Sequence, residues 1–165
     1  MIKLFYSGVY ASPHSQITKK NIKEKLHDDV RSHLVDNIND VLYYSKKGIL
    51  TKNPNVLYMG GFYFEKPHKL IIQGIVDSEL SEILHSNLIV VNLLGDNAIA
   101  SISELLYAAS KNKQIEVFVK NTPNPFTITS KYWFPILTAT KLTKSINIHK
   151  VSSNQDVINF IMKLN

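Results

Sequence analysis

A nearly unbroken apolar segment, Leu88 to Leu94, is the feature that most constrains the fold of this chain. Apolar residues at consecutive positions are typical of a strand that is covered on both faces, as in a parallel sheet. A second buried strand is predicted at Ile115 to Val119, and the residues from Ile99 to Asn112 are expected to form a helix between them. A strand, a helix and a strand in this order predict a right-handed crossover between parallel strands.

The same alternation of strands and helices extends over the rest of the chain. Further strands are predicted at 2–7, 56–59 and 146–151, and helices at about 15–46, 70–85 and 156–164. The helix over 15–46 is predicted because apolar residues recur there about every four positions. We therefore expect an α/β fold in one domain, residues 1–165: a doubly wound, flavodoxin-like parallel sheet of about five strands with helices on both faces.

Composition limits the environment of the protein. The chain is 44% hydrophobic and 19% charged, which is ordinary for a soluble globular protein. It contains no apolar run near the ~20 residues that span a bilayer, and its N-terminal stretch has no basic leader, so neither a membrane span nor a signal peptide is expected. With no cysteine, it offers no disulfide or thiolate metal site. A cytoplasmic location is the expectation.

The formal charge of +6 predicts a surface that attracts anions. Nucleic acid is not expected as a partner, because the lysines are scattered and accompany no nucleic-acid motif. Small anionic molecules are the expected partners of this basic surface instead. The six histidines show no ligand spacing such as HExxH, so no metal is expected, and only His68 is kept as a ligand contact.

Residues suited to a binding site follow the predicted strands. In an open parallel sheet, ligands bind beyond the carboxyl ends of the strands. Glycines there let a ligand approach the backbone, and aromatic rings offer a stacking surface for a base. The candidate binding residues are Gly8, Tyr10, Gly60, Gly61, Phe62, Asp96, Ser101 and Ser103.

Glu104 is the candidate for chemistry, and two interpretations of it stay open. Ser101-x-x-Glu104 fits a capping box, in which both side chains bond to the first turn of their own helix; spacing alone favours this interpretation. Alternatively, an ionised Glu104 carboxylate attacks an anomeric carbon, while Ser101 and Ser103 hold a phosphate or a sugar hydroxyl. Glu79 and Glu82 are by themselves expected on the solvated face of a helix.

The segment from Glu79 to Val119 resembles the nucleoside 2-deoxyribosyltransferase family and its nucleotide N-glycoside hydrolase relatives. E-L-S-E-I-L-H-S-N-L-I-V-V is similar to the acidic helix that leads into the third strand of that family. S-E-L-L-Y-A-A-S-K-N-K-Q-I is similar to its E-L-G-Y-A-x-x-x-G-K-x-V segment, whose Glu is the nucleophile. A weaker match to its Gly-Pro-Phe strand end is either Tyr58 to Phe62 or Leu4 to Tyr10.

The resemblance implies that Glu104 is the nucleophile and that Glu79 is a carboxylate that orients it and contacts the sugar. It implies double displacement on a nucleoside or nucleotide without a metal or organic cofactor, and a homo-oligomer whose subunits complete each other's pockets. The chain departs from the family pattern at three places between Ala98 and Leu106, and neither candidate for the Gly-Pro-Phe strand end has the proline. Ala98 replaces an Asp, Ala100-Ser101 replaces a Gly-Thr pair, and Leu106 replaces a Gly.

Three hypotheses about function follow. The first is an enzyme that cleaves or transfers the N-glycosidic bond of a (deoxy)nucleoside or nucleotide. The second is a Toll/interleukin-receptor-like NAD glycohydrolase, because that fold also places a catalytic Glu after a Ser-bearing stretch such as Ser101 to Leu105. The third is a non-catalytic nucleotide-binding module on the same scaffold, which the missing Asp at position 98 favours.

Overall fold

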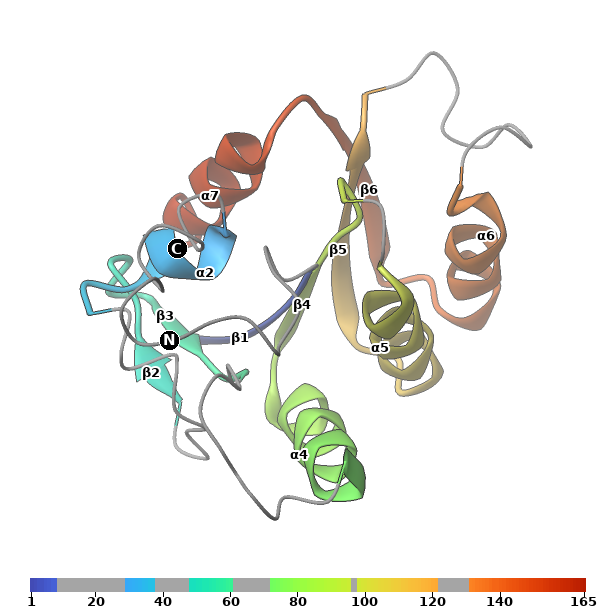
Figure 1. The fold of residues 1–165 in the computed structure, drawn as a ribbon, viewed down its shortest axis with the longest axis horizontal. Helices are drawn as coiled ribbons and strands as arrows, with labels where there is room; N and C mark the ends of the chain where they lie inside the picture. Colours follow the sequence, from blue (N-terminus) through green and yellow to red (C-terminus); the bar gives the residue numbers. More distant parts are fainter. Residues whose placement is uncertain (9–28, 38–47, 61–71, 96–97, 122–130) are drawn as a thin grey trace.

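The structure is a computed structural model that describes residues 1–8, 29–37, 48–60, 72–95, 98–121 and 131–165 (Figure 1). Its strands form one six-stranded sheet. The strands are β1 (Ile2–Gly8), β2 (Ile49–Leu50), β3 (Val56–Tyr58), β4 (Leu88–Asn92), β5 (Gln114–Lys120) and β6 (Ile146–Val151). The helices of the described ranges are α2 (Val30–Leu34), α4 (Ile72–His85), α5 (Ile99–Ser110), α6 (Trp133–Leu142) and α7 (Asn154–Met162).

The sheet has the predicted flavodoxin-like order. Its strands follow one another as β2-β3-β1-β4-β5-β6, and every neighbouring pair is parallel except β2 with β3. Leaving out β2, the five parallel strands follow the order 2-1-3-4-5 that is typical of flavodoxin-like folds. The sixth strand, β2, is an addition that the sequence does not predict, because two residues at a sheet edge carry no periodic pattern.

Helices cover both faces of the sheet, as predicted (Figure 1). In β1, Leu4 and Tyr6 point to one face, where they pack in a core cluster with residues of α2 and α7. Phe5 belongs to the opposite face, whose core cluster includes residues of α4, α5 and α6. Because side chains alternate along a strand, Ser7 lies on the face of α4 and α5, whereas Gly8 lies on the face of α2.

The helix predicted over 15–46 is wrong for the part of it that the structure describes. α2 has only five residues, and the backbone is extended at Asp29 before it and at Val35 after it. Asp29 caps the helix by accepting a hydrogen bond from the Arg31 N–H. Val30, Leu34 and Val35 are buried in the core, so their apolar spacing reflects packing of a short helix. The flanking parts of the prediction lie outside the described residues.

Helix α6 was not predicted from the sequence. It begins at Trp133, several residues after Pro123 and Pro125, and it contains Pro135 itself. Proline is tolerated in the first turn of a helix, because the N–H that it lacks has no partner within the helix there. The other helices and the parallel strands lie within a few residues of their predicted ranges.

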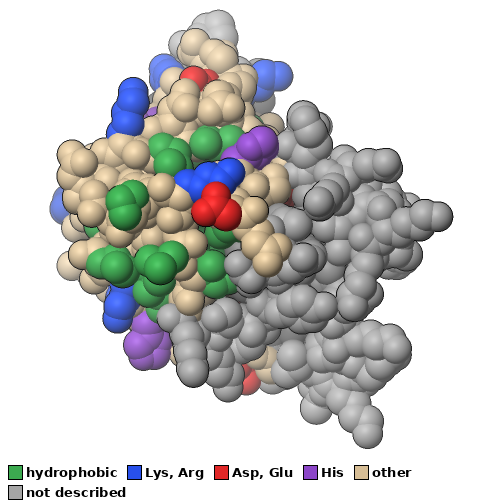
Figure 2. Space-filling model, turned by 90° about the vertical axis from the view of Figure 1, so that its left-hand side faces the viewer, with side chains coloured by type: hydrophobic (Ala, Val, Ile, Leu, Met, Phe, Trp, Pro, Cys, Tyr) green, Lys and Arg blue, Asp and Glu red, His purple; other side chains and the backbone are tan. Residues whose placement is uncertain are grey.

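One face of the described part carries polar, charged and hydrophobic side chains side by side (Figure 2). On the face drawn in Figure 2, hydrophobic side chains lie in small groups among polar ones, with Lys, Arg, Asp, Glu and His side chains between them. Among the described residues, no helix combines the length and the apolar character that crossing a bilayer requires.

Candidate functional site

The candidate site lies where β1, β3 and β4 end. The chain crosses from β1 to β3 on one side of β1, whereas β4, β5 and β6 follow on the other side. This reversal next to β1 is the switch point at which doubly wound sheets bind their ligands. Gly8, the last residue of β1, pairs with Asn92 at the end of β4, and Gly60 follows β3 closely.

Glu104 is directed at the end of β1. It lies in the second turn of α5, and its half-buried carboxylate accepts a short hydrogen bond from the buried Ser7 hydroxyl. The capping-box interpretation is wrong, because α5 begins earlier than that interpretation requires. The N-cap residue is Ala98, which has no side-chain cap hydrogen bond, and Ser101 is buried inside the helix. The Glu104 carboxylate therefore bonds to β1 rather than to the first turn of its own helix.

The environment of Glu104 changes its acidity. Burial raises the pKa of its carboxyl group above 4.5, while the hydrogen bond from Ser7 and the positive charge of Arg31 oppose part of this rise. Burial disfavours the charged form, and a donor or a cation favours it. A carboxylate with opposing influences of this kind at a sheet switch point is a typical candidate for chemistry.

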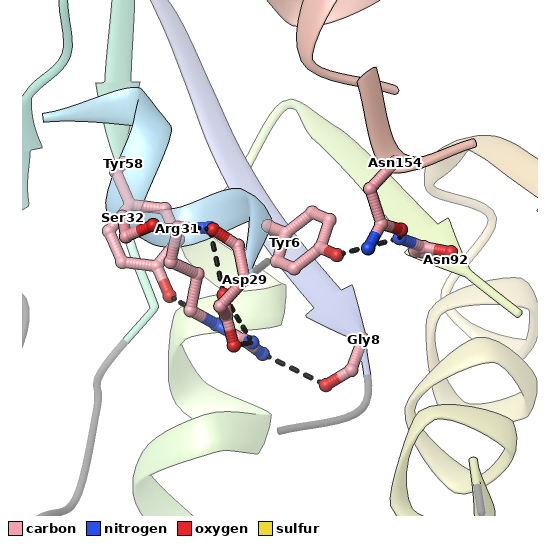
Figure 3. Close-up of polar contacts among 8 residues, drawn as sticks. All are labelled: Tyr6, Gly8, Asp29, Arg31, Ser32, Tyr58, Asn92 and Asn154. Carbon is pink, nitrogen blue, oxygen red and sulfur yellow. Dashed lines mark hydrogen bonds and ion pairs between the residues drawn. The ribbon is translucent and has the colours of Figure 1, made fainter. Parts of the chain in front are cut away.

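Arg31, the second residue of α2, binds groups of three segments (Figure 3). Its Nη1 lies 3.3 Å from Oδ2 of Asp29, with which it forms a buried ion pair. Its Nε donates to the Tyr58 hydroxyl at 3.3 Å, and its Nη2 donates to the Gly8 carbonyl at 3.1 Å. The guanidinium also lies over the Tyr6 ring, 4.7 Å from the centroid. Arg31 thus connects α2 to the ends of β1 and β3.

Two buried tyrosines complete this region. The Tyr6 hydroxyl accepts a hydrogen bond from the Asn92 side chain at 2.9 Å, and Asn92 also donates to Asn154, the first residue of α7, at 2.8 Å (Figure 3). Burial raises the pKa of both Tyr6 and Tyr58, so the two hydroxyls stay protonated at neutral pH. They are neutral hydrogen-bonding groups placed behind the strand ends.

Gly8 and Gly60 leave room for these tyrosines. A Cβ on Gly8 would lie 2.5 Å from the Tyr6 hydroxyl oxygen, and one on Gly60 would lie 2.9 Å from that of Tyr58. In each case the hydroxyl belongs to the residue two positions earlier, so the glycine lets the ring lie over the strand end. Sequence reasoning assigned both glycines to ligand contact and did not foresee this role.

Replacing Gly8 by Ala is expected to destabilise the protein by about 1–3 kcal/mol, the usual cost of overpacking. The added methyl group would meet the buried Tyr6 ring, which would have to move away from Asn92. Gly60→Ala is the matched control with a milder contact, and a smaller loss is expected. Urea unfolding of both variants measures the difference, and an equal or larger loss for Gly60→Ala would contradict the packing described.

The other predicted site residues are placed as follows. Glu79 is half-buried on α4. The pKa of Tyr58 is raised mainly by burial, and the negative charge of Glu79 adds to this rise, so the Glu79 charge is felt at the end of β3. Ser103 is exposed and its hydroxyl donates to the Ile99 carbonyl of its own helix at 3.3 Å, whereas Ser101 is buried. The expectation that Glu82 is solvated is wrong, since it is 5% exposed. Tyr10, Gly61, Phe62, His68 and Asp96 lie outside the described residues.

Ser7 and Arg31 both influence Glu104, and neither was predicted as a site residue. Each nevertheless has a feature in the sequence that could have pointed to it. Arg31 is the single arginine among 19 basic residues. Ser7 is a hydroxyl at the end of an apolar strand, directly before Gly8. In the part of the chain that the structure describes, no group of three His, Asp or Glu side chains could hold a metal ion.

Comparison with known proteins identifies a fold relative. No family model and no curated protein matches the chain. Its structure is similar to that of the Clostridium botulinum CMP N-glycosidase BcmB, with a TM-score of 0.53, 9% sequence identity and coverage of 96% of each chain. At this identity the likeness concerns the fold. The predicted resemblance to nucleotide N-glycoside hydrolases of the nucleoside 2-deoxyribosyltransferase type is confirmed at that level.

Proposed function

We propose that this protein cleaves the N-glycosidic bond of a nucleoside or nucleotide, with Glu104 as the nucleophile. The observation that carries the proposal is the direction of the Glu104 carboxylate. It reaches the end of β1, at the switch point of the sheet, and bonds to Ser7 instead of capping its helix. The fold shared with a protein named as a CMP N-glycosidase supports the same reaction class.

The proposed reaction is a double displacement. A Glu104 oxygen attacks the anomeric carbon of the sugar, the bond from that carbon to the base nitrogen breaks, and the base leaves with the electron pair and takes up a proton. The resulting glycosyl ester is then opened by water, or by a second base in a transfer reaction. Ser7 holds one carboxylate oxygen and so fixes the orientation of the attacking group.

Glu79 is proposed to be the second carboxylate of the site, with a role in orienting the sugar. Its position on α4, with its charge acting on Tyr58 at the end of β3, supports this role. The formal charge of +6 favours phosphorylated substrates over neutral ones, because a basic protein concentrates anions near its surface. Gly8 and Gly60 are kept as proposed contacts, since Gly8 ends β1 directly after Ser7, the donor to Glu104, and Gly60 follows the end of β3.

One panel of assays tests the proposed reaction. The protein is incubated with deoxynucleosides, ribonucleosides, their monophosphates and NAD, with and without a free acceptor base, and base release is followed by chromatography. We expect release of a nucleobase from a nucleoside or nucleotide. Release of nicotinamide alone would support the NAD glycohydrolase instead, and nucleotide binding without any release would support a non-catalytic module.

Ser7→Ala is expected to lower the rate of base release about 10- to 100-fold at neutral pH, the range that one hydrogen bond to a charged group supports. Loss of this donor raises the pKa of Glu104 further, so the acidic limb of the pH–rate profile should move to higher pH. Ser110→Ala is the matched control, because that hydroxyl is exposed and bonds to its own helix. A Ser7→Ala profile identical to that of the control would contradict this role.

A further inference from the structure

Arg31 is bound so completely by the protein that a direct role in holding a ligand is unfavoured. All three nitrogens of its guanidinium donate to protein acceptors: Asp29, the Tyr58 hydroxyl and the Gly8 carbonyl. The side chain is 5% exposed and lies against the Tyr6 ring. A planar guanidinium can satisfy several fixed acceptors at once, which a lysine ammonium cannot do in the same geometry.

These contacts fix the framework of the candidate site. The Gly8 carbonyl directly follows Ser7, the donor to Glu104, and Tyr58 is the last residue of β3 (Figure 3). One side chain therefore joins the ends of two neighbouring strands. Asp29 holds the guanidinium in place from the N-cap position before α2.

The charge of Arg31 acts in the same direction as the Ser7 hydrogen bond. It lowers the pKa of Glu104 against the effect of burial. Among the described residues, the titratable groups shown near its guanidinium include Asp29 from the start of α2, Tyr6 from β1 and Tyr58 from β3, and Glu79 from α4 acts on Tyr58. Asp29 offsets part of the positive charge, and both tyrosines are neutral.

We propose that Arg31 is a positioning residue of this site: its guanidinium joins the ends of β1 and β3 next to Ser7, the donor to Glu104, and places a positive charge there without contacting the substrate. The role rests on the proposed function, in which Glu104 must be ionised to attack. The effect of the Arg31 charge on the titration of Glu104 can be measured without any turnover.

The test is a titration of Glu104 by carbon-13 NMR of its side-chain carboxyl carbon, assigned by comparison with Glu104→Gln. In Arg31→Met the midpoint should move to higher pH. Lys163→Met, which removes an exposed positive charge at the end of α7, should leave it unchanged. Arg31→Lys keeps the charge and should restore most of the wild-type midpoint. Should Arg31→Met fail to fold, Arg31→Gln is the second neutral variant, because its amide still offers donors to Gly8.

An unchanged midpoint in a folded, charge-neutral variant would overturn the proposal. Steady-state kinetics give a second criterion, since a positioning residue should lower kcat and move the acidic limb of the rate profile to higher pH. A variant that instead raises KM for monophosphates alone would show that Arg31 binds the phosphate, which also overturns it. If no substrate releases its base, the proposed function fails while the NMR titration still decides the electrostatic role.

Discussion

Glu104→Gln is expected to abolish base release, with a loss of at least about a thousandfold, because an amide cannot act as the nucleophile. The change keeps the size of the side chain and an oxygen that can accept the bond from Ser7. Chromatographic rates for the variant and the wild type measure the effect. Asp77→Asn, which neutralises an exposed carboxylate on α4, is the control and should retain activity.

The same variant should be more stable than the wild type at neutral pH. Burial raises the pKa of Glu104, so the folded state binds its proton more tightly than the unfolded state does. The folded state therefore loses stability as the pH rises from the ordinary pKa of a glutamate side chain through the raised pKa of Glu104. Glu104→Gln removes this cost, so a gain in the free energy of unfolding is expected at pH 7, and this gain should shrink towards pH 4. Inactivity together with a stability loss at pH 7 would instead indicate a structural role.

Asp29→Ala is expected to cost about 3–5 kcal/mol of stability, the range found when one partner of a buried ion pair is removed. The substitution leaves the Arg31 guanidinium buried without its carboxylate and also removes the cap of α2. Urea unfolding followed by circular dichroism measures the loss. Because activity depends on the same framework, the folded fraction of this variant should also release base more slowly.

Two comparisons make the Asp29 result specific. Asp156→Ala removes another acidic residue from a helix N-terminus, but this one is partly exposed and accepts hydrogen bonds from Ser152 and Ser153 rather than from a buried cation, so a smaller loss is expected. Combining Asp29→Ala with Arg31→Met removes the unpaired charge and should recover part of the stability. A loss for Asp29→Ala no greater than that for Asp156→Ala would contradict the buried ion pair.

The parallel sheet could be predicted because each central strand carries its own signal. Leu88 to Asn92 and Ile115 to Val119 are apolar at nearly every position, and this pattern depends only on burial of both faces. The short helix α2 could not be predicted, because its apolar spacing continues into neighbouring residues while Asp29 and Val35 are extended. Local patterns thus predicted the layers of the fold, but they gave the wrong length for α2 and missed α6.

The site was less predictable, since its contacts join distant parts of the chain. Ser7 and Glu104 are 97 positions apart, and Arg31 bonds to Gly8 and Tyr58, which are 23 and 27 positions away. The spacing of Ser101 and Glu104 pointed to a local capping box that tertiary structure overrides. α5 begins at Ile99, which places Ser101 inside the helix and turns Glu104 towards β1.

The most direct test of the account is mass spectrometry of the protein quenched during turnover of a 2-fluoro analogue of its best substrate. Fluorine beside the anomeric carbon slows breakdown of a glycosyl ester, because the transition state carries positive charge there. We predict that the peptide containing Glu104 gains the mass of the sugar or sugar phosphate, and that Glu104→Gln gains none. Base release from the analogue with the adduct on another residue, or with no adduct at all, would contradict Glu104 as the nucleophile.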